Sequence, residues 1–517
     1  KPDSKNKTQR SDDRIVIDLP SQNVCSKRQS AADRQKLKSF SEEKKIMKRK
    51  ILSGKDLIKL GYPEGRAIGI AINTVLKHFR RSEKEEIYAM LRNVLSAPKN
   101  FINDSIWSKV ALELIPSEKK SLVYELNKSR MDYRIYGAAE IEEGARNQME
   151  IAMKLPITAG GALMPDAHQG YGLPIGGVLA TKDVVIPYGV GVDIGCRMCL
   201  TAYPLNETFL QRNRSNLKQM LVDNTCFGRE TFKRPKEHEI LDSSLFREIT
   251  ILKPLQGRAA AQIGSSGSGN HFVEFGLVHL PEDNEWNLST GSYLALLSHS
   301  GSRGLGAEIA RHYTKVARQI CMLPGEASNL AWLDLNTDAG QEYWLAMNLA
   351  GDYASANHQQ IHERIASALG ESPLLQVENH HNFAWKETLA DGTQVIVHRK
   401  GATPAGKGVL GIIPGSMTTP GFIVKGKGNV DSLQSASHGA GRLMSRSAAK
   451  QSITKKMVRQ ALDKSGVELI GGGLDEAPMA YKDILKVMHY QNDLVEVLGT
   501  FVPKIVRMCG DETPAED

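Results

Sequence analysis

Residues 184–196 read Val-Val-Ile-Pro-Tyr-Gly-Val-Gly-Val-Asp-Ile-Gly-Cys, a short apolar run followed by closely spaced glycines. A β-branched run that ends in turn residues is typical of a strand in a globular core. Similar runs return at residues 412–413 and 422–424, while helical periodicity covers about 342–369 and 476–492. This mixture of patterns predicts one large α+β domain.

Composition changes along the 517 residues and divides them into four parts. The large α+β domain is expected over residues 131–510, where glycine is dense. Residues 46–130 carry helical periodicity and predict a small α-helical accessory domain. Residues 1–45 lack sustained apolar periodicity and predict a disordered basic arm, and residues 511–517 form an acidic tail.

The net charge of +8 is concentrated near the start of the sequence. Residues 1–50 hold 15 Lys or Arg and 7 Asp or Glu, and the remainder is neutral. A basic arm indicates a polyanionic partner, most often nucleic acid, although a solvated tail fits the charge equally well. Within the helical part, residues 54–65 loosely resemble the helical RNA-binding tails of tRNA nucleotidyltransferases, and an ordinary packing domain fits the same pattern.

Composition also excludes several classes of protein. Six cysteines among 517 residues do not make a disulfide framework. No apolar run approaches the roughly 18 residues that a transmembrane helix needs. We therefore expect a reduced, cytoplasmic protein without a membrane span.

Polar residues with metal-ligand chemistry gather in short segments, most of them rich in glycine. These residues are Asp166 and His168; Asp193 and Cys196; Asn270, His271 and Glu274; His299 and Arg303; His380, His381 and Asn382; and His438 and Arg442. Each residue alone is a weak signal, because a single histidine is more often structural than a ligand. Together, imidazole and carboxylate groups suit manganese, iron, cobalt or zinc, and a thiolate shifts the preference toward softer ions.

Three shorter motifs suggest other chemistry, and each lacks an essential part. Cys196 and Cys199 form a CxxC pair without a second ligand pair or a thioredoxin-like context. His358 and His362 share one helical face but lack the glutamate of a metalloprotease motif, which favours a structural or surface role. Residues 401–408 resemble a phosphate-binding loop but end in glycine where Ser or Thr is required.

A series of blocks gives these segments a more specific meaning. In chain order they are MPDAHQGYG, IPYGVGVDIGCRM, GSSGSGNHFVE, HSGSRGLG, HHN, RKGAT, GIIPGSM, SHGAGRLMSR and EAPMAYKDI with LVEV. Their order and spacing resemble the RtcB family of GTP-dependent RNA ligases over about three quarters of the chain. The resemblance implies the family's α+β fold, with a central metal cleft.

The resemblance also implies site residues. It implies two manganese ions, one held by Asp193, Cys196 and His271 and the other by Cys196, His299 and His381, with Cys196 bridging. It implies His438 as the histidine that is guanylylated from GTP. The expected nucleotide-binding residues are Asn270, Glu274, Asn382, Ser416, His438, Gly439, Ala440, Gly441 and Arg442. Arg303 matches a residue on the path of the RNA phosphates.

The implied activity joins RNA ends that carry a 2′,3′-cyclic phosphate or 3′-phosphate to a 5′-hydroxyl, in tRNA splicing or RNA repair. The protein is then expected to be a monomer with an archease-like activating partner. Met508 stands where the family often has a lysine that contacts guanine, which predicts a relaxed preference for GTP. Two alternatives stay open: a metal phosphoesterase that does not ligate, and a non-catalytic RNA-binding protein.

Overall fold

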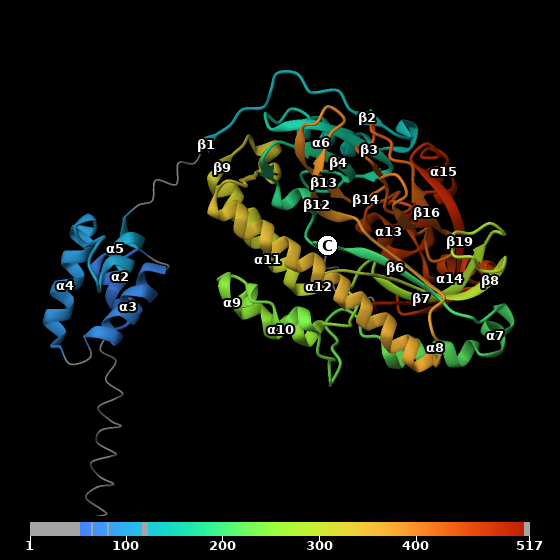
Figure 1. Cartoon of the computed structure of the whole chain (residues 1–517), viewed down its shortest axis with the longest axis horizontal. Coiled ribbons are helices and arrows are strands. Elements are labelled where there is room, and N and C mark those ends of the chain that lie inside the picture. Colours follow the sequence, from blue (N-terminus) through green and yellow to red (C-terminus); the bar gives the residue numbers. More distant parts are fainter. Residues whose placement is uncertain (1–51, 64–65, 80–81, 116–121, 511–517) are drawn as a thin grey trace, which may run out of the picture. The chain divides into compact units, whose positions relative to one another are not determined.

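The structure is a computed structural model. It describes residues 52–63, 66–79, 82–115 and 122–510. The chain divides into two compact units, residues 1–119 and 120–517 (Figure 1). The predicted basic arm, residues 1–45, and the acidic tail, residues 511–517, lie outside the described residues.

The smaller unit is a set of short helices. They are α2 (Gly54–Leu60), α3 (Arg66–His78), α4 (Lys84–Ser96), η1 (Pro98–Phe101) and α5 (Ser108–Leu114). Apolar residues at spacings of three and four place Ala71 and Val75 of α3 and Leu91 of α4 in a shared core, where all three are fully buried. The hydroxyl of Tyr62 donates to the Leu91 carbonyl at 2.9 Å. This unit therefore has an apolar core of its own.

Two sheets organise the larger unit. The first has the strand order β11-β6-β8-β7-β19-β16-β15, with β18 paired to β19. Its strands are β6 (Arg197–Ala202), β7 (Phe272–Leu280), β8 (Gly291–Ser300), β11 (Leu375–His380), β15 (Leu410–Ile413), β16 (Gly421–Gly426), β18 (Glu468–Ile470) and β19 (Val495–Met508). The side-chain amide of Asn379 in β11 bonds both the N–H and the C=O of Ile412 in β15. The two ends of the sheet thereby meet, and the sheet is a nearly closed barrel.

The second sheet has the order β12-β13-β4-β3-β2. Its strands are β2 (Arg134–Ile135), β3 (Thr158–His168), β4 (Ile175–Thr181), β12 (Asn382–Thr388) and β13 (Gln394–Lys400). Three short pairs complete the strands: β1 (Leu122–Val123) with β9 (Cys321–Met322), β5 (Val184–Val185) with β10 (Leu333–Asp334), and β14 (Ala402–Pro404) with β17 (Ser435–Ser437). Strand β1 lies within the stretch expected to be helical, yet it pairs with the larger unit.

Helices surround these sheets. They are η2 (Ala138–Glu140), α6 (Glu143–Ala152), η3 (Pro187–Val190), α7 (Glu207–Arg212), α8 (Arg214–Asn224), η4 (Glu239–Asp242), α9 (Leu245–Glu248), η5 (Lys253–Leu255), α10 (Gln256–Gln262), α11 (Arg303–Ile320), η6 (Gly325–Leu330), α12 (Asp338–Leu369), α13 (Arg446–Ser452), α14 (Lys455–Ser465), η7 (Leu474–Glu476), η8 (Pro478–Ala480) and α15 (Ile484–His489). Within the described ranges, none of them combines the length and apolarity that a membrane span requires.

The long helix predicted over residues 342–369 is confirmed by α12, which is capped by Thr337 and ends at Gly370 with a φ of 75°. The helix predicted over 476–492 is wrong. That stretch holds the last residue of η7, the turn η8 and the six-residue α15. Pro478 has no N–H to donate and begins η8, so a continuous helix cannot pass through it.

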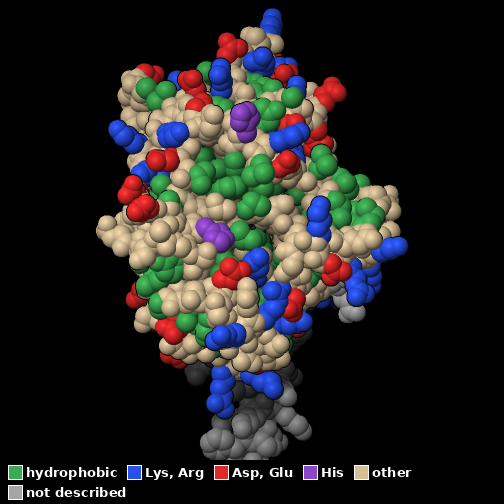
Figure 2. All heavy atoms as spheres, turned by 90° about the vertical axis from the view of Figure 1, so that its right-hand side faces the viewer, with side chains coloured by type: hydrophobic (Ala, Val, Ile, Leu, Met, Phe, Trp, Pro, Cys, Tyr) green, Lys and Arg blue, Asp and Glu red, His purple; other side chains and the backbone are tan. Residues whose placement is uncertain are grey.

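Strands β6 and β8 present different chemistry on their two faces. Met198, Leu297 and His299 line a cleft, whereas Cys199 and Ser298, which are cross-strand partners, face α12. This alternation follows from the two-residue period of a strand. The side of the larger unit shown in Figure 2 mixes Lys and Arg with Asp and Glu and carries a band of hydrophobic side chains.

Candidate metal and nucleotide cleft

Both large sheets contribute to one cleft of about 600 Å³. The five-stranded sheet supplies His168, Asn382 and Lys400, while the barrel-like sheet supplies Glu274 and His299. The loops that carry the glycine-rich blocks add the remaining walls. The resulting cleft brings together segments that lie more than 200 residues apart in the sequence.

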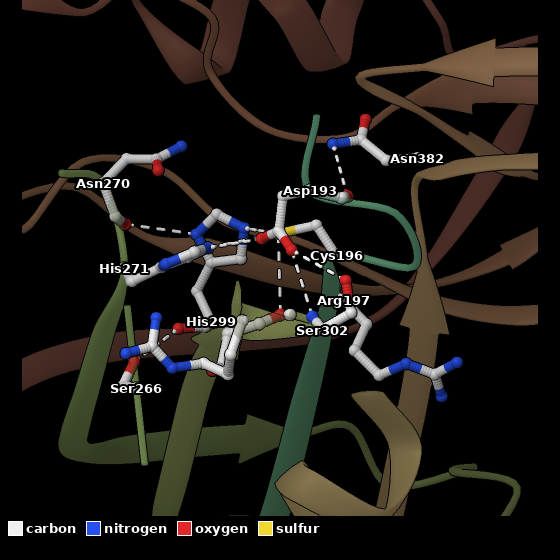
Figure 3. A network of polar contacts seen from close by, with 12 residues as sticks. Asp193, Cys196, Arg197, Ser266, Asn270, His271, His299, Ser302 and Asn382 are labelled. Atoms are coloured by element: carbon white, nitrogen blue, oxygen red, sulfur yellow. Dashed lines mark hydrogen bonds and ion pairs between the residues drawn. The ribbon is translucent and has the colours of Figure 1, made fainter. Parts of the chain in front are cut away.

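A group of ligand atoms converges on the thiol of Cys196 at the floor of this cleft. The Sγ atom lies 3.3 Å from His271 Nε2 and 3.1 Å from His299 Nε2. His299 Nε2 is 3.3 Å from His381 Nε2, and His271 Nε2 is 3.1 Å from Asp193 Oδ2. Figure 3 shows Asp193, Cys196, His271 and His299 pointing toward one another.

Hydrogen bonds hold two of these groups in the orientation of metal ligands. His299 Nδ1 donates to the Asn270 carbonyl at 3.1 Å, which leaves its Nε2 lone pair toward Cys196. The Asp193 carboxylate accepts from the Ser302 N–H at 3.0 Å and from the Ser302 hydroxyl. These partners fix the ligand atoms before any ion binds.

The protonation states also suit a metal. Burial lowers the pKa of His299 to about 3 and that of His381 well below 6.5, so both imidazoles are neutral. Burial raises the pKa of Asp193, but the hydrogen bond and charge of His271 outweigh this effect. The pKa therefore lies below its ordinary value, and the carboxylate stays ionised. Nδ1 of His271 and Nδ1 of His381 have no hydrogen-bond partner. A buried set of N, O and S donors is chemically suited to a divalent transition metal.

Gly301 shows how closely the backbone approaches this cluster. A Cβ atom at Gly301 would lie 2.1 Å from Asp193 Oδ2. Any side chain there would displace the carboxylate, so the glycine after Ser300 is required by packing rather than by flexibility.

His438 lies beside the cluster and is held by Asp166. His438 Nδ1 is 2.6 Å from Asp166 Oδ2, and the same oxygen accepts from the backbone N–H groups of His438 and Gly439. The ring centroids of His438 and His381 are 5.0 Å apart. Asp166 is fully buried, and although burial raises its pKa, the charge and hydrogen bond of His438 bring it below the ordinary value.

The loop after His438 follows Asp166 closely. Gly441 has a φ of 70°, and a Cβ there would lie 2.0 Å from the Asp166 carbonyl oxygen. Gly439, Ala440 and Gly441 all line the cleft. Arg442 also lines it, and its guanidinium donates to the carbonyls of Met444 and Asp475 and contacts Glu476.

A more apolar part of the cleft surrounds Glu274. This carboxyl is 4% exposed, and burial raises its pKa well above 4.5. Met508 lines the same cleft and pairs with Phe272 in register, two residues from Glu274 along β7. Arg507, the neighbour of Met508, turns away and donates to carbonyls of Leu221 and Thr225 near the end of α8. Arg507 therefore does not take the place of the missing lysine.

Other predicted residues occupy the walls. Asn382 accepts from the Gly401 N–H at 2.8 Å and donates to the Asp193 carbonyl at 3.4 Å, which ties the two loops together. Ser416 lies in a turn closed by Thr419 and lines the cleft, as does Asn270. Arg303 is different: it is buried, donates to Ser265 Oγ and the Gly228 carbonyl, and is not among the cleft-lining residues.

Two residues of the site, Asp166 and Lys400, have contacts that the sequence did not predict. Asp166 stood out as a potential ligand, but the sequence did not pair it with His438, which is 272 residues away. Lys400 was part of a matching block only. It lines the cleft, donates to the Tyr171 carbonyl at 2.6 Å, and burial lowers its pKa to about 7. The signal in the sequence that could have identified Lys400 is a lysine placed shortly after the apolar run 395–397.

Neither the CxxC pair nor the phosphate-binding loop forms in the structure. Cys196 faces the cleft and Cys199 faces α12, so the two thiols lie on opposite sides of β6. Residues 401–408 form β14 and a turn, and the next described element is the strand β15 rather than a helix. Phosphate-loop geometry is therefore absent from this segment.

Comparisons with known proteins agree with these features. A family model described as tRNA-splicing ligase RtcB matches residues 148–253 and 247–508. RNA-splicing ligase RtcB1 of Escherichia coli is 34% identical over 392 residues, which cover 70% of this chain and 93% of that protein. The tRNA-splicing ligase RtcB of Archaeoglobus fulgidus is 31% identical over 423 residues, covering 68% and 88%.

The fold and the site define a class of α+β proteins in which two sheets enclose buried cysteine and histidine side chains that could hold metal ions. Within that class, the chain belongs to the RtcB family. Asp193, Cys196, His271, His299 and His381 are together called the Cys196 cluster. The matched residues include all five of them as well as His438. Residues before 148 lie outside the family match.

Proposed function

We propose that this protein is a GTP- and manganese-dependent RNA ligase that works through a guanylylated His438. The observation that carries the proposal is the 2.6 Å contact between His438 Nδ1 and the buried Asp166 carboxylate, beside the Cys196 cluster. The relatives named RNA-splicing and tRNA-splicing ligases support the same class of activity.

His438 is the nucleophile in this proposal. Its Nδ1–H donates to Asp166, so the lone pair is on Nε2 and is available for attack. A bond forms between Nε2 and the α-phosphorus of GTP as the bond to pyrophosphate breaks. The GMP group then passes to the RNA 3′-phosphate, and attack by the 5′-hydroxyl releases GMP. A 2′,3′-cyclic phosphate is first opened by water to a 3′-phosphate.

The Cys196 cluster is proposed to hold two manganese ions. Asp193, Cys196 and His271 would hold one, and Cys196, His299 and His381 the other. Bound manganese would neutralise phosphate charge and polarise phosphoryl oxygens. The chain's own contribution includes keeping His299 neutral through burial and oriented through the Asn270 carbonyl.

The nucleotide is proposed to extend from His438 into the apolar part of the cleft. Ala440 and Gly441 line the cleft, so their backbone N–H groups can approach phosphate closely, and Arg442 lies beside them. Asn270, Asn382 and Ser416 would contact the nucleotide, and the Glu274 carboxyl would accept from the guanine N–H groups. Because Met508 cannot donate, base recognition would depend mainly on Glu274.

RNA is the proposed polymer substrate, with broken tRNA or other cleaved RNA as its source. The basic arm and the helical unit are proposed to add affinity for its phosphates. Arg303 would reach RNA phosphate only after leaving its contacts with Ser265 and Gly228. A cytoplasmic monomer assisted by an archease-like partner completes the proposal.

Met508 favours one alternative, a phosphoesterase that opens cyclic phosphates without ligating. One experiment separates the two activities. The protein is incubated with manganese and α-labelled GTP, and then with RNA that carries defined ends. Acid-labile label on the protein, its loss in His438→Ala and its retention in the exposed control His279→Ala would support the ligase. Opening of cyclic phosphate without any label would support the phosphoesterase.

A further inference from the structure

A second cluster of cysteine and histidine lies on the other side of the strands that carry the metal ligands. Cys199, His358 and His362 are all buried, and their ligand atoms lie within 4.8 Å of one another. The two histidines are four residues apart on α12, so they share one face of that helix. Ligand types and proximity alone would suggest another metal site.

The hydrogen bonds indicate a different use. His358 Nε2 is 3.1 Å from the Ser300 carbonyl oxygen, and His358 Nδ1 is 2.8 Å from Ser298 Oγ. His362 Nε2 is 2.8 Å from the same Ser298 oxygen, and His362 Nδ1 is 2.7 Å from Thr201 Oγ1. Each of the four ring nitrogens thus has an oxygen partner, and none is left for a metal.

These contacts allow one arrangement of protons when both rings are neutral. Burial lowers the pKa of His362 to about 3 and that of His358 well below 6.5. A carbonyl only accepts, so His358 carries its proton on Nε2 and its Nδ1 accepts from the Ser298 hydroxyl. That hydroxyl has no second proton, so His362 must donate to it from Nε2.

Beyond His362, the chain of hydrogen bonds continues to Thr201 of β6 and Gln376 of β11. His362 Nδ1 accepts from the Thr201 hydroxyl, and Thr201 Oγ1 accepts from the Gln376 amide at 3.2 Å. Each group between Gln376 and the Ser300 carbonyl therefore accepts a hydrogen bond from the group before it and donates one to the group after it. A chain of this kind specifies one geometry, because reversing any ring leaves a buried group unpaired.

The end of this hydrogen-bond chain is at the metal cluster. Ser298 and Ser300 flank His299 on β8, and His358 contacts the Ser298 hydroxyl and the Ser300 carbonyl from the side opposite to the His299 ring. The Ser300 carbonyl that accepts from His358 also lies 3.5 Å from Cys196 Sγ. The two histidines consequently hold the backbone on both sides of one ligand and beside another.

We propose that His358 and His362 are positioning residues that fix His299 and Cys196 from behind the sheet through an ordered hydrogen-bond chain. This inference rests on the proposed metal function of the Cys196 cluster. It concerns only residues of this protein and does not depend on which divalent ion binds. It also accounts for the polar side chains between β8 and α12, where apolar ones would pack at lower cost.

The first test is manganese affinity of the full chain, measured by titration without GTP or RNA. His358→Phe should weaken binding by about 10- to 100-fold, the usual cost of losing an outer partner of a ligand. His358→Gln, which keeps an amide donor near the position of Nε2, should recover most of that loss. Tyr353→Phe on the same helix loses a buried hydrogen bond to Ala259 of α10 and serves as the control for stability.

Unfolding midpoints measured without metal separate positioning from folding. If His358→Phe and Tyr353→Phe are destabilised alike and bind manganese alike, the positioning role is overturned. If the wild type itself binds no manganese, the proposed metal function fails instead, and the two failures are thereby distinct.

The second test needs no metal. Long-range ¹H–¹⁵N spectra of the histidine-labelled full chain, assigned with His358→Gln and His362→Gln, should place both protons on Nε2. A proton on Nδ1 of either ring would contradict the hydrogen-bond chain. Stoichiometric zinc that is lost in Cys199→Ser and retained in Cys196→Ala would also overturn the proposal, because it would make the cluster a second metal site.

Discussion

The two Cys/His clusters lie back to back on β6 and β8, and they differ in what their ring nitrogens contact. On the cleft side, the Nε2 atoms of His271, His299 and His381 point at a thiol, a carboxylate and one another, and the only oxygen they meet among the described residues is Oδ2 of Asp193. On the helix side, each nitrogen of His358 and His362 meets an oxygen. Similar residue types thus make a candidate metal centre on one face and, on the other, a hydrogen-bonded pair of histidines proposed to position the ligands.

Ligand types therefore do not identify a metal site by themselves. The contacts that the candidate ligand atoms already make decide it. A buried polar group without a partner is costly, so a cluster of such groups is expected where a ligand will complete them. A cluster that is already complete is expected to contribute rigidity instead.

The largest expected effect distinguishes the two cysteines. Cys196→Ala should abolish manganese binding and ligation, because Cys196 contacts both halves of the cluster. The loss should exceed the roughly 10- to 100-fold cost of removing an outer partner. Cys199→Ala should retain both properties. Titration with manganese and a ligation assay check this pair, and equal loss in the two variants would remove the distinction between the faces.

Asp166→Asn tests whether guanylylation depends on the tautomer of His438 that Asp166 stabilises. The substitution keeps the shape but replaces an acceptor of the His438 Nδ1 proton with a group that can donate. Guanylylation should slow by roughly 100-fold or more, the scale of a correctly held catalytic imidazole. Manganese affinity should stay unchanged. A normal rate of labelling would show that Asp166 only shapes the loop.

Much of this cleft was predictable from the sequence, because it is built from short blocks whose order marks a family. The pairing of Asp166 with His438 was not, since it depends on how β3 meets the loop after β17. The hydrogen-bond chain through His358 and His362 could not be predicted from the sequence either. The spacing of His358 and His362 places them on one helical face, but whether Ser298 and Thr201 meet them depends on strand register. Arg303 was expected near RNA, yet its side chain packs inside the wall.

Met508→Lys tests the base-recognition end of the cleft. A lysine there would restore a charged donor, and a hydrogen bond to a charged group is worth about 1.5–3 kcal/mol, or about 10- to 150-fold. Discrimination of GTP against ATP should rise by up to that factor. Competition of ATP and ITP against labelled GTP measures it. If ATP already fails to compete with the wild type at roughly thousandfold excess, another residue supplies the missing contact.

The remaining expected effect is on stability rather than activity; it concerns pH, and Lys400 is its source. Burial lowers the pKa of this cleft lysine to about 7 from an ordinary 10.5. Between these values the unfolded chain binds the extra proton, so the free energy of unfolding rises with pH, by at most about 1.36 kcal/mol per pH unit. Lys400→Met should remove this part of the slope between about pH 7 and pH 10.

The matched control for that slope is on the helix side. His362 is neutral throughout this range, because its pKa is about 3. His362→Phe should therefore lower stability by the same amount at every pH. An unchanged slope in Lys400→Met would show that burial does not lower the pKa of Lys400.

The decisive experiment is labelling of the full chain by α-labelled GTP in the presence of manganese, followed by mapping of the labelled residue. We expect acid-labile label on His438, abolished in His438→Ala and in Cys196→Ala and kept in Cys199→Ala. Label that survives in His438→Ala, or that maps to another residue, would contradict the proposed role of His438.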